Sequence, residues 1–411
     1  MSKHVVFITV RAMFITLVLL SCGTKEEEFD WPRWRGPNGN GISNEANWDP
    51  ETLSGGPKIL WRVDVGMGHS NVAIRDNRLY TMGVTKDGNT VVCLNADTGQ
   101  EIWRYSFESS HESQSTATTD GKFVYTLNTE GILLCLKARN GKLRWKKELV
   151  NDYKTERIPY GYTGAPVVED DLIIMNVNTA GIALSKKSGE LIWGSNVHTS
   201  KRNMNGYHAT PVLFDHKGKR CALLFSGTGL FCVEVETGKQ VWVFEYPLGT
   251  ANCADPILID DKVFISAGYT TDQGTLLEIT GDEPKVVWQN KNMGTEFSTC
   301  AYVDGYLYGS DGDANGFLPF RCIDAKTGDV MWEEKMKMVS ITVADRKLIV
   351  LEEDGILHIA EATPSSYKET SCCQLPSKTG FHKWWTPPVL CNGRIYCRNW
   401  AGDLVCIDVS K

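Results

Sequence analysis

The sequence lacks several features that identify common classes of protein. It contains no C-x-x-C-H motif, so it carries no covalent c-type haem of its own. Beyond its N-terminal segment it has no apolar run long enough to span a bilayer. Its formal net charge is −7, which argues against the basic binding face that nucleic acids require. The chain also shows no sustained helical periodicity, and we therefore expect an almost entirely β protein.

What the chain does contain is a repeated 13-residue unit. The first copy, Val91–Trp103, reads VVCLNADTGQEIW: an apolar strand, a polar turn closed by glycine, and a second strand that ends on tryptophan. Further copies are Leu133–Trp145, Gly181–Trp193, Leu230–Trp242, Leu276–Trp288 and Phe320–Trp332. The glycine supplies the positive φ that a tight hairpin needs, and the apolar and β-branched residues fit a pleated surface. Each unit therefore predicts a β-hairpin.

The tryptophans measure the period of the repeat. They recur about every 42 to 49 residues, enough for the four short strands of one propeller blade. These blade-motif residues are Trp61, Trp103, Trp145, Trp193, Trp242, Trp288 and Trp332. An eighth unit, Leu357–Glu369, keeps the strand-turn-strand outline without the tryptophan. The sequence thus predicts an all-β, eight-bladed propeller of four-stranded antiparallel blades.

The two ends of the chain predict how the ring closes. The last residues, Leu404–Lys411 (LVCIDVSK), form the first half of a repeat, and Gly55–Trp61 (GGPKILW) forms the second half. We expect an N-terminal strand to complete the last blade, with Trp61 beside Val405 and Cys406, so that two open sheet edges pair. The alternative is a coincidence between two short segments.

These repeats, of the form C-L-x-A-x-T-G-x-x-x-W, resemble a known family. They are similar to the pyrroloquinoline-quinone-like (PQQ-like) β-propeller repeats of bacterial quinoprotein dehydrogenases and of the outer-membrane assembly lipoprotein. The opening Trp31–Gly41 (WPRWRGPNGNG) and the closing Trp385–Val389 (WTPPV) resemble an envelope lipoprotein subfamily of these propellers. The resemblance covers residues 31–411, which we take as one propeller domain. WD40 propellers are disfavoured, because aspartate never follows the repeat tryptophan.

The N-terminus predicts export. Lys3 and Arg11 precede the short apolar run Ala12–Leu20, and the following Ser21-Cys22 completes a segment that resembles the lipobox of bacterial lipoproteins. We expect residues 1–21 to be a signal peptide, Cys22 to be lipidated and residues 22–30 to be an acidic tether. The protein would then be anchored in the bacterial cell envelope, at the periplasmic or surface side of the outer membrane. A plain secretory cleavage site or an uncleaved anchor is the alternative.

The sequence has 13 cysteines, yet their placement argues against a disulfide framework. Several occupy the third position of the repeat, namely Cys93, Cys135, Cys232, Cys322 and Cys406. Equivalent positions lie in different blades, too far apart to pair. We expect these residues to be free thiols that fill the core. The adjacent Cys372 and Cys373 are either free or paired with other cysteines.

Candidate binding residues come from the segments that lead into the inner strands. In a propeller these segments crowd the central channel and one mouth, a usual location for binding sites. The candidates are His69, Gln114, Tyr162, Tyr207, His208, Asn252, Asp255, Glu296, His382, Trp384 and Trp385. The histidines are either ligand-binding groups or hydrogen-bonded rim residues. The paired tryptophans either stack on a sugar, a quinone or a peptide side chain, or pack structurally.

Asp255 differs from its counterparts, since it puts a carboxylate before Pro256. Two interpretations are open. It is a metal ligand or general base, with Asn252 and Glu296 as further oxygen ligands for a hard cation such as Ca²⁺. Otherwise its carboxylate accepts backbone N–H bonds near the start of a strand.

The resemblance also implies a possible activity. The family's enzymes bind the quinone between a tryptophan floor and a disulfide of adjacent cysteines, with Ca²⁺ held by Glu and Asn and an Asp as base. The matching positions here are Asp255 as base, Asn252 and Glu296 on Ca²⁺, and Trp384 as floor. Cys372 and Cys373 lie in the outer part of the degenerate repeat, so they do not match the family's cysteine pair.

The function predicted is therefore a non-catalytic envelope lipoprotein, without a metal or cofactor, that binds or scaffolds other envelope proteins. Its rigid face and blade edges can receive a peptide as an added strand or on the loops. The alternative is a quinoprotein-like oxidoreductase acting on alcohols or sugars with pyrroloquinoline quinone and Ca²⁺. A third possibility is recognition of a saccharide or small ligand through Trp384, Trp385 and Tyr207.

Overall fold

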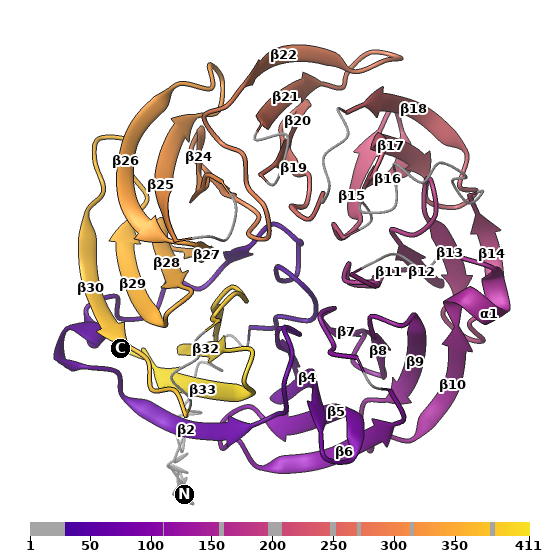
Figure 1. The fold of residues 1–411 in the computed structure, drawn as a ribbon, viewed down its shortest axis with the longest axis horizontal. Helices are drawn as coiled ribbons and strands as arrows, with labels where there is room; N and C mark the ends of the chain where they lie inside the picture. Colours follow the sequence, from indigo (N-terminus) through magenta and orange to yellow (C-terminus); the bar gives the residue numbers. More distant parts are fainter. Residues whose placement is uncertain are drawn as a thin grey trace, which may run out of the picture.

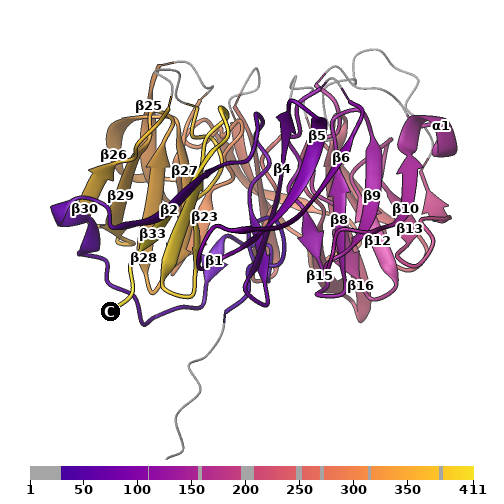
Figure 2. The same ribbon diagram turned by 90° about the horizontal axis from the view of Figure 1, so that it is seen from below.

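The structure is a computed structural model that describes residues 29–109, 111–155, 160–195, 208–246, 252–268, 273–312, 316–378 and 383–411. Its strands form eight sheets arranged as blades around a central axis (Figure 1), which confirms the predicted eight-bladed propeller. Figure 2 shows the ring from the side, with the strands running between its two faces. The predicted signal peptide, Cys22 and most of the tether lie outside the described residues.

Each blade is numbered along the chain, and its strands are given from the channel outward. Blade 1 contains β3 (Ala73–Arg75), β4 (Arg78–Thr85), β5 (Gly88–Asn95) and β6 (Glu101–Phe107), and blade 2 contains β7 (Thr118–Thr119), β8 (Phe123–Leu127), β9 (Ile132–Lys137) and β10 (Leu143–Glu148). Blade 3 contains β11 (Val167–Glu169), β12 (Leu172–Met175), β13 (Ile182–Ser185) and β14 (Leu191–Gly194). Blade 4 contains β15 (Val212–His216), β16 (Lys219–Ser226), β17 (Gly229–Glu234) and β18 (Gln240–Glu245).

Blades 5 to 8 follow the same order. Blade 5 contains β19 (Ile257–Ile259), β20 (Lys262–Ala267), β21 (Gln273–Glu278) and β22 (Lys285–Asn290), and blade 6 contains β23 (Ala301–Val303), β24 (Tyr306–Ser310), β25 (Phe317–Asp324) and β26 (Val330–Lys337). Blade 7 contains β27 (Val339–Ala344), β28 (Lys347–Glu352), β29 (Ile356–Glu361) and β30 (Glu369–Gln374). Blade 8 contains β31 (Val389–Cys391), β32 (Arg394–Arg398), β33 (Asp403–Asp408) and β2 (Ile59–Asp64).

The repeat unit forms the outer hairpin of each blade. In blade 1, Cys93 on β5 pairs with Trp103 on β6, and Gly99 in the turn has a φ of 69°. The repeat glycines Gly141, Gly189, Gly238 and Gly328 likewise have φ between 68° and 76°. This positive φ is the conformation that the sequence predicted for the turn.

The repeat tryptophan also contacts the next blade, which the sequence analysis did not predict. The indole of Trp103 donates a 2.9 Å hydrogen bond to the carbonyl of Ala138 in blade 2. A Cβ atom on Gly141, in the turn of that blade, would lie 2.5 Å from the Trp103 ring. The glycine therefore serves two purposes: it allows the turn, and it leaves room for the tryptophan of the preceding blade.

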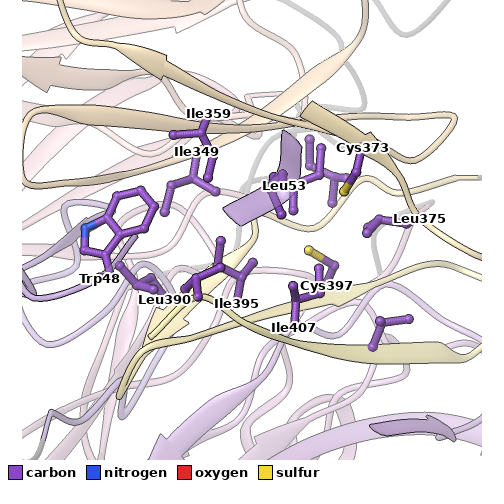
Figure 3. Packing of buried hydrophobic residues seen from close by; sticks show 14 of the residues in the cluster. Trp48, Leu53, Ile349, Ile359, Cys373, Leu375, Leu390, Ile395, Cys397 and Ile407 are labelled. Carbon is purple, nitrogen blue, oxygen red and sulfur yellow. The ribbon is translucent and has the colours of Figure 1, made fainter. Parts of the chain in front are cut away.

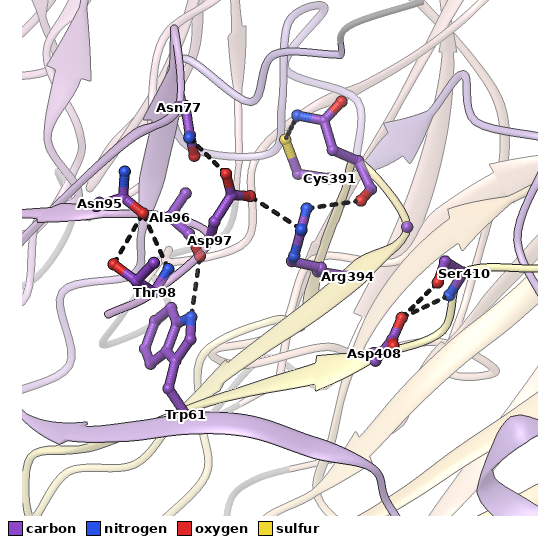
Figure 4. Close-up of polar contacts among 12 residues, drawn as sticks. Trp61, Asn77, Asn95, Ala96, Asp97, Thr98, Cys391, Arg394, Asp408 and Ser410 are labelled. Carbon is purple, nitrogen blue, oxygen red and sulfur yellow. Dashed lines mark hydrogen bonds and ion pairs between the residues drawn. The ribbon is translucent and has the colours of Figure 1, made fainter. Parts of the chain in front are cut away.

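Ring closure occurs as predicted. The N-terminal strand β2 pairs antiparallel with β33, so that Trp61 lies opposite Cys406 and Arg62 opposite Val405. The Trp61 indole donates to the carbonyl of Ala96 in blade 1, at 3.0 Å (Figure 4). The N-terminal strand thus completes the blade that the C-terminal strands form, and the two ends of the chain are paired in one sheet.

Blade 7 departs from the prediction. Its outer strand β30 begins at Glu369, whereas the sequence predicted that the unit would end there. The β-bulge that precedes the tryptophan in other blades lies beside Ser371 here, so Ser371 takes the tryptophan's place. Trp48, from the N-terminal segment, is buried between blades 7 and 8 instead, together with Leu53 (Figure 3). A tryptophan supplied from elsewhere in the chain thus fills the gap at the degenerate repeat.

The N-terminal segment, residues 29–58, links the channel to the rim of the ring. Near the channel its β1 (Ile42–Ser43) adds a parallel fifth strand to the inner side of blade 7. A short 3₁₀ helix, η1 (Thr52–Gly55), then packs near β30 before β2 begins. The described residues otherwise contain one short α-helix, α1 (Leu149–Tyr153), and none of their helices has the length and apolar character needed to cross a membrane.

The cysteines that the structure describes are free thiols, as predicted for the repeat positions. Burial raises the pKa of the Cys93, Cys135, Cys322 and Cys406 thiols to about 12, which keeps them protonated. The adjacent pair on β30 is split: Cys372 is exposed and Cys373 is buried. Successive side chains on a strand point to opposite faces, which explains the split.

Candidate functional site

The N-terminal segment crosses the central channel, where Figure 1 shows it passing between the inner strands. Trp31 pairs with Ile74 of blade 1, and the Trp34 indole donates a 2.7 Å hydrogen bond to Asp255, which leads into blade 5. Arg35 is buried and donates to the carbonyl of Cys300 at 2.8 Å. One short segment therefore contacts blades on different sides of the ring.

A cavity of about 660 Å³ lies beside this segment. Its walls come mainly from the residues that precede the inner strands, with Trp34 from the N-terminal segment and Glu353 from the β28–β29 turn. The lining residues are Trp34, His69, Gln114, Thr116, Tyr160, Thr163, Ala165, His208, Thr210, Cys253, Asp255, Glu296, Phe297, Glu353, Lys383, Trp385 and Thr386. The cavity is mixed in character, with aromatic rings, hydroxyl groups and charged side chains.

The predicted channel-mouth residues fall into three groups. Those in the cavity wall are His69, Gln114, His208, Asp255, Glu296 and Trp385. Tyr162, Asn252 and Trp384 are buried away from the lining. Tyr207 and His382 lie outside the described residues. A ligand-binding role for the first group stays a prediction.

The three residues of the second group have structural partners. The Tyr162 hydroxyl forms a 2.6 Å hydrogen bond with Thr155. The Asn252 amide donates to the carbonyl of Ser226 at 2.7 Å. Trp384 is fully buried in the cluster between blades 7 and 8, so it cannot be the stacking floor that the alternative interpretation required. The sequence could not decide between the adjacent tryptophans, because they precede β31 in a segment without regular secondary structure, where the sequence pattern does not set side-chain direction.

Asp255 is the most constrained residue of the cavity wall. Its Oδ1 accepts the backbone N–H of Thr210 at 2.6 Å, and its Oδ2 accepts the Trp34 indole. The Arg35 Nη1 lies 3.9 Å from the same Oδ2. Burial raises the pKa of Asp255, and the Arg35 charge opposes that effect. These contacts correspond to the interpretation in which the carboxylate accepts N–H bonds near a strand start.

An aromatic cluster forms another part of the lining. The Trp385 ring stacks on His69 at a centroid distance of 4.8 Å and on Phe297 at 5.1 Å. The Lys383 ammonium lies 4.4 Å from its centroid, and Glu353 accepts its indole N–H at 3.0 Å. These neighbours hold the ring in one orientation.

Both histidines of the cavity wall are neutral at pH 7. Burial lowers the pKa of His69 to about 3, helped by the positive charges of Arg398 and Lys383. Burial likewise lowers the pKa of His208 to about 4, and its Nδ1 lies 2.9 Å from the Thr163 hydroxyl. They can therefore act as hydrogen-bonding groups without carrying charge.

Two of the residues proposed for a quinone and Ca²⁺, Asp255 and Trp384, do not fit the roles assigned to them. Ca²⁺ requires several oxygen ligands, but both oxygens of Asp255 already hold protein donors and a guanidinium lies beside them. Trp384 lies in the core, and the adjacent cysteines lie on β30, the outermost strand of blade 7. No catalytic step can be derived through these groups from the geometry.

Trp34 and Glu353 were missed by the sequence analysis. The signal for Trp34 was present in the Trp- and Arg-rich opening segment, but that segment has no period that would place it in the channel. Glu353 follows the second strand of blade 7 and therefore falls outside the segments that lead into inner strands.

Comparison with known proteins finds a family model and several relatives that this chain resembles. The family model described as outer membrane protein assembly factor BamB matches residues 54–290. The protein of that name from Salmonella typhimurium is 24% identical over 74% of this chain and 88% of its own length. A quinohemoprotein alcohol dehydrogenase, ADH IIB of Pseudomonas putida, is 30% identical over 33% of this chain and 21% of its own length.

Solved structures show the same fold. BamB from Moraxella catarrhalis has a TM-score of 0.64 and 16% identity, covering 85% of this chain and 97% of its own. A quinohemoprotein alcohol dehydrogenase from Comamonas testosteroni has a TM-score of 0.72 and 12% identity, covering 92% of this chain and 80% of its own. At these identities the structural likeness establishes the shared fold, but it does not distinguish between an assembly factor and an alcohol dehydrogenase.

Proposed function

The chain belongs to the family described as outer membrane protein assembly factor BamB, and from that membership we propose that it is a non-catalytic propeller that scaffolds other proteins of the cell envelope. Its partners are outer-membrane assembly proteins, by analogy with the relatives named for that role. A lipid on Cys22 tethers it to the outer membrane, with residues 22–30 as the spacer. The rigid ring then presents its loops and blade edges to the partner.

The observation that carries the proposal is the state of Asp255. A general base must have a lone pair within hydrogen-bond reach of the substrate proton. Here both carboxylate oxygens accept N–H groups of the protein: Oδ1 accepts the backbone N–H of Thr210, and Oδ2 accepts the indole of Trp34 in the N-terminal segment. The residue matched to the catalytic base of the dehydrogenases therefore supports the architecture of the ring.

The cavity supports a second candidate function, recognition of a saccharide or other small ligand. The lining includes the aromatic side chains of Trp34, Phe297 and Trp385, together with hydroxyl, carboxylate, imidazole, amide and ammonium groups. Aromatic faces with nearby polar groups suit a sugar ring, which has apolar faces and hydroxyl edges. This candidate is compatible with scaffolding, because the cavity and the outer blade edges are separate surfaces.

Affinity capture from native membranes tests the scaffold. The tagged full chain is expressed in its own host, crosslinked in intact cells and purified from solubilised membranes. We expect outer-membrane assembly proteins to be enriched with it, and a Cys22→Ala variant to lose membrane association and that enrichment together. A control lipoprotein is expressed at the same level and purified in the same way. Recovery of the full chain in the same amount as this control, but without any assembly protein, would contradict the proposal.

A further inference from the structure

The outer half of blade 7 holds a mixed cluster of nitrogen, oxygen and sulfur groups. His358 and Cys372 lie opposite each other on β29 and β30, and Glu369 is the first residue of β30. One ligand atom from each of the three lies within 4.8 Å of the others. Zinc takes imidazole nitrogen, carboxylate oxygen and thiolate sulfur as ligands. We propose that His358, Glu369 and Cys372 form a binding site for one Zn²⁺ ion.

The imidazole of His358 is already oriented for this role. Its Nε2 lies 3.0 Å from Glu352, a buried residue whose other oxygen accepts the backbone N–H of Lys337 at 2.7 Å. Its Nδ1 lies 2.5 Å from Glu369. A carboxylate that accepts one ring N–H fixes the tautomer and leaves the second nitrogen for a metal. Glu352 is therefore a positioning residue, and Nδ1 is the ligand atom.

The cluster also has a route from solvent. His358 is buried, whereas Glu369 and Cys372 are exposed. Among the cysteines that the structure describes, Cys372 is the exposed one. Three protein ligands leave one position of a tetrahedral ion for water. Because the thiol must lose its proton to bind, zinc affinity rises with pH.

Blade 6 offers an internal comparison. There Arg321 occupies the position of His358, opposite Glu333, and is paired with Glu333 and Asp311. That arrangement is a permanent ion-pair network. In blade 7 the arginine position holds His358, which can lose its proton, and the position of the opposite glutamate holds the thiol of Cys372. These two changes turn an ion-pair position into a set of metal ligands.

Cobalt substitution tests the site in the purified full chain. Co²⁺ bound to a thiolate gives a charge-transfer absorption band in the near ultraviolet, and we expect one equivalent of Co²⁺ that Zn²⁺ displaces. Cys372→Ser should abolish the band. Absence of the band in the full chain at neutral pH, or its persistence in Cys372→Ser, would overturn the proposal.

Two further variants test the site by their zinc affinity, a measurement that does not depend on the cobalt absorption band. Glu352→Gln should weaken zinc binding by about 10- to 100-fold in a chelator competition assay, the usual effect of losing an orienting carboxylate. Glu369→Gln should weaken it at least as much. The matched control is Glu361→Gln on β29, the strand of His358, where the carboxylate pairs with Lys347. Equal zinc affinities in all three variants, each folded by circular dichroism, would contradict the assignment.

Discussion

Trp34 and Asp255, 221 residues apart in the chain, are joined by a 2.7 Å hydrogen bond inside the channel of the propeller. The bond ties a segment that precedes the first blade to a residue that leads into the fifth. It gives Asp255 a structural partner at the position where the dehydrogenase interpretation placed a catalytic base.

Removing this bond should destabilise the protein. In Trp34→Phe the ring remains, but the Asp255 Oδ2 loses its indole donor inside a buried site, and we expect a loss of ~1–3 kcal/mol in the free energy of unfolding. The measurement is denaturant unfolding. Trp385→Phe is the matched control, since its indole bonds to the half-buried Glu353 in the same cavity. A loss in Trp34→Phe no greater than in the control would contradict the structural role of the bond.

The contact between blades predicts a difference between two glycines. Gly238 (φ 68°) and Gly218 (φ 77°) share a conformation, but a Cβ on Gly238 would lie 2.5 Å from the Trp193 ring, whereas Gly218 faces open space. Gly218→Ala should therefore cost only ~1–2 kcal/mol, from the left-handed backbone. Gly238→Ala should cost ~1–3 kcal/mol more, from overpacking against the indole. Equal losses in denaturant unfolding would show that the tryptophan does not need the space.

Trp48 should be necessary for the seam between blades 7 and 8. It is fully buried where the degenerate repeat has Ser371 in place of tryptophan. Trp48→Ala should cost ~3–5 kcal/mol, typical of truncating a buried aromatic side chain, and Trp48→Phe should recover much of that loss. The midpoints of thermal unfolding measure both. A Trp48→Ala protein as stable as the full-length parent would rule out this compensation.

Acid should weaken the protein through His208. Its folded pKa is about 4, below the 6.5 of an ordinary histidine, so the unfolded chain binds more protons between these values. The contribution to stability is complete above pH 6.5 and is lost as the pH falls toward 4, by at most ~3 kcal/mol. Denaturant unfolding at a series of pH values measures it. His208→Gln should remove the share of this slope that His208 contributes, while His69 keeps its own share. An unchanged slope in that variant would contradict the assignment.

Local pattern was sufficient to predict the ring. The hairpins and the positive φ of Gly99 follow from residues that are neighbours in a strand or a turn, and the pairing of Trp61 with Cys406 follows from the two half-repeats at the ends of the chain. The repeat encodes these contacts many times over, so the signal is strong. The start of β30 was misplaced because that unit has lost its tryptophan and has a longer turn.

Contacts made by segments outside the repeat could not be predicted in the same way. Trp34 belongs to a segment with no repeat, so no period relates it to Asp255. The two tryptophans before β31 differ only by one position, yet Trp384 enters the core and Trp385 faces the cavity. Side-chain direction at such a point depends on the backbone path, which the sequence pattern does not specify.

A titration with pyrroloquinoline quinone and Ca²⁺ tests most directly the central claim that this propeller is a scaffold without dehydrogenase chemistry. The purified full chain is titrated at micromolar cofactor, and cofactor absorbance and alcohol-dependent dye reduction are recorded. We predict neither cofactor uptake nor dye reduction above that of the cofactor in buffer. Stoichiometric uptake, with dye reduction that Asp255→Asn abolishes in a folded protein, would contradict the account.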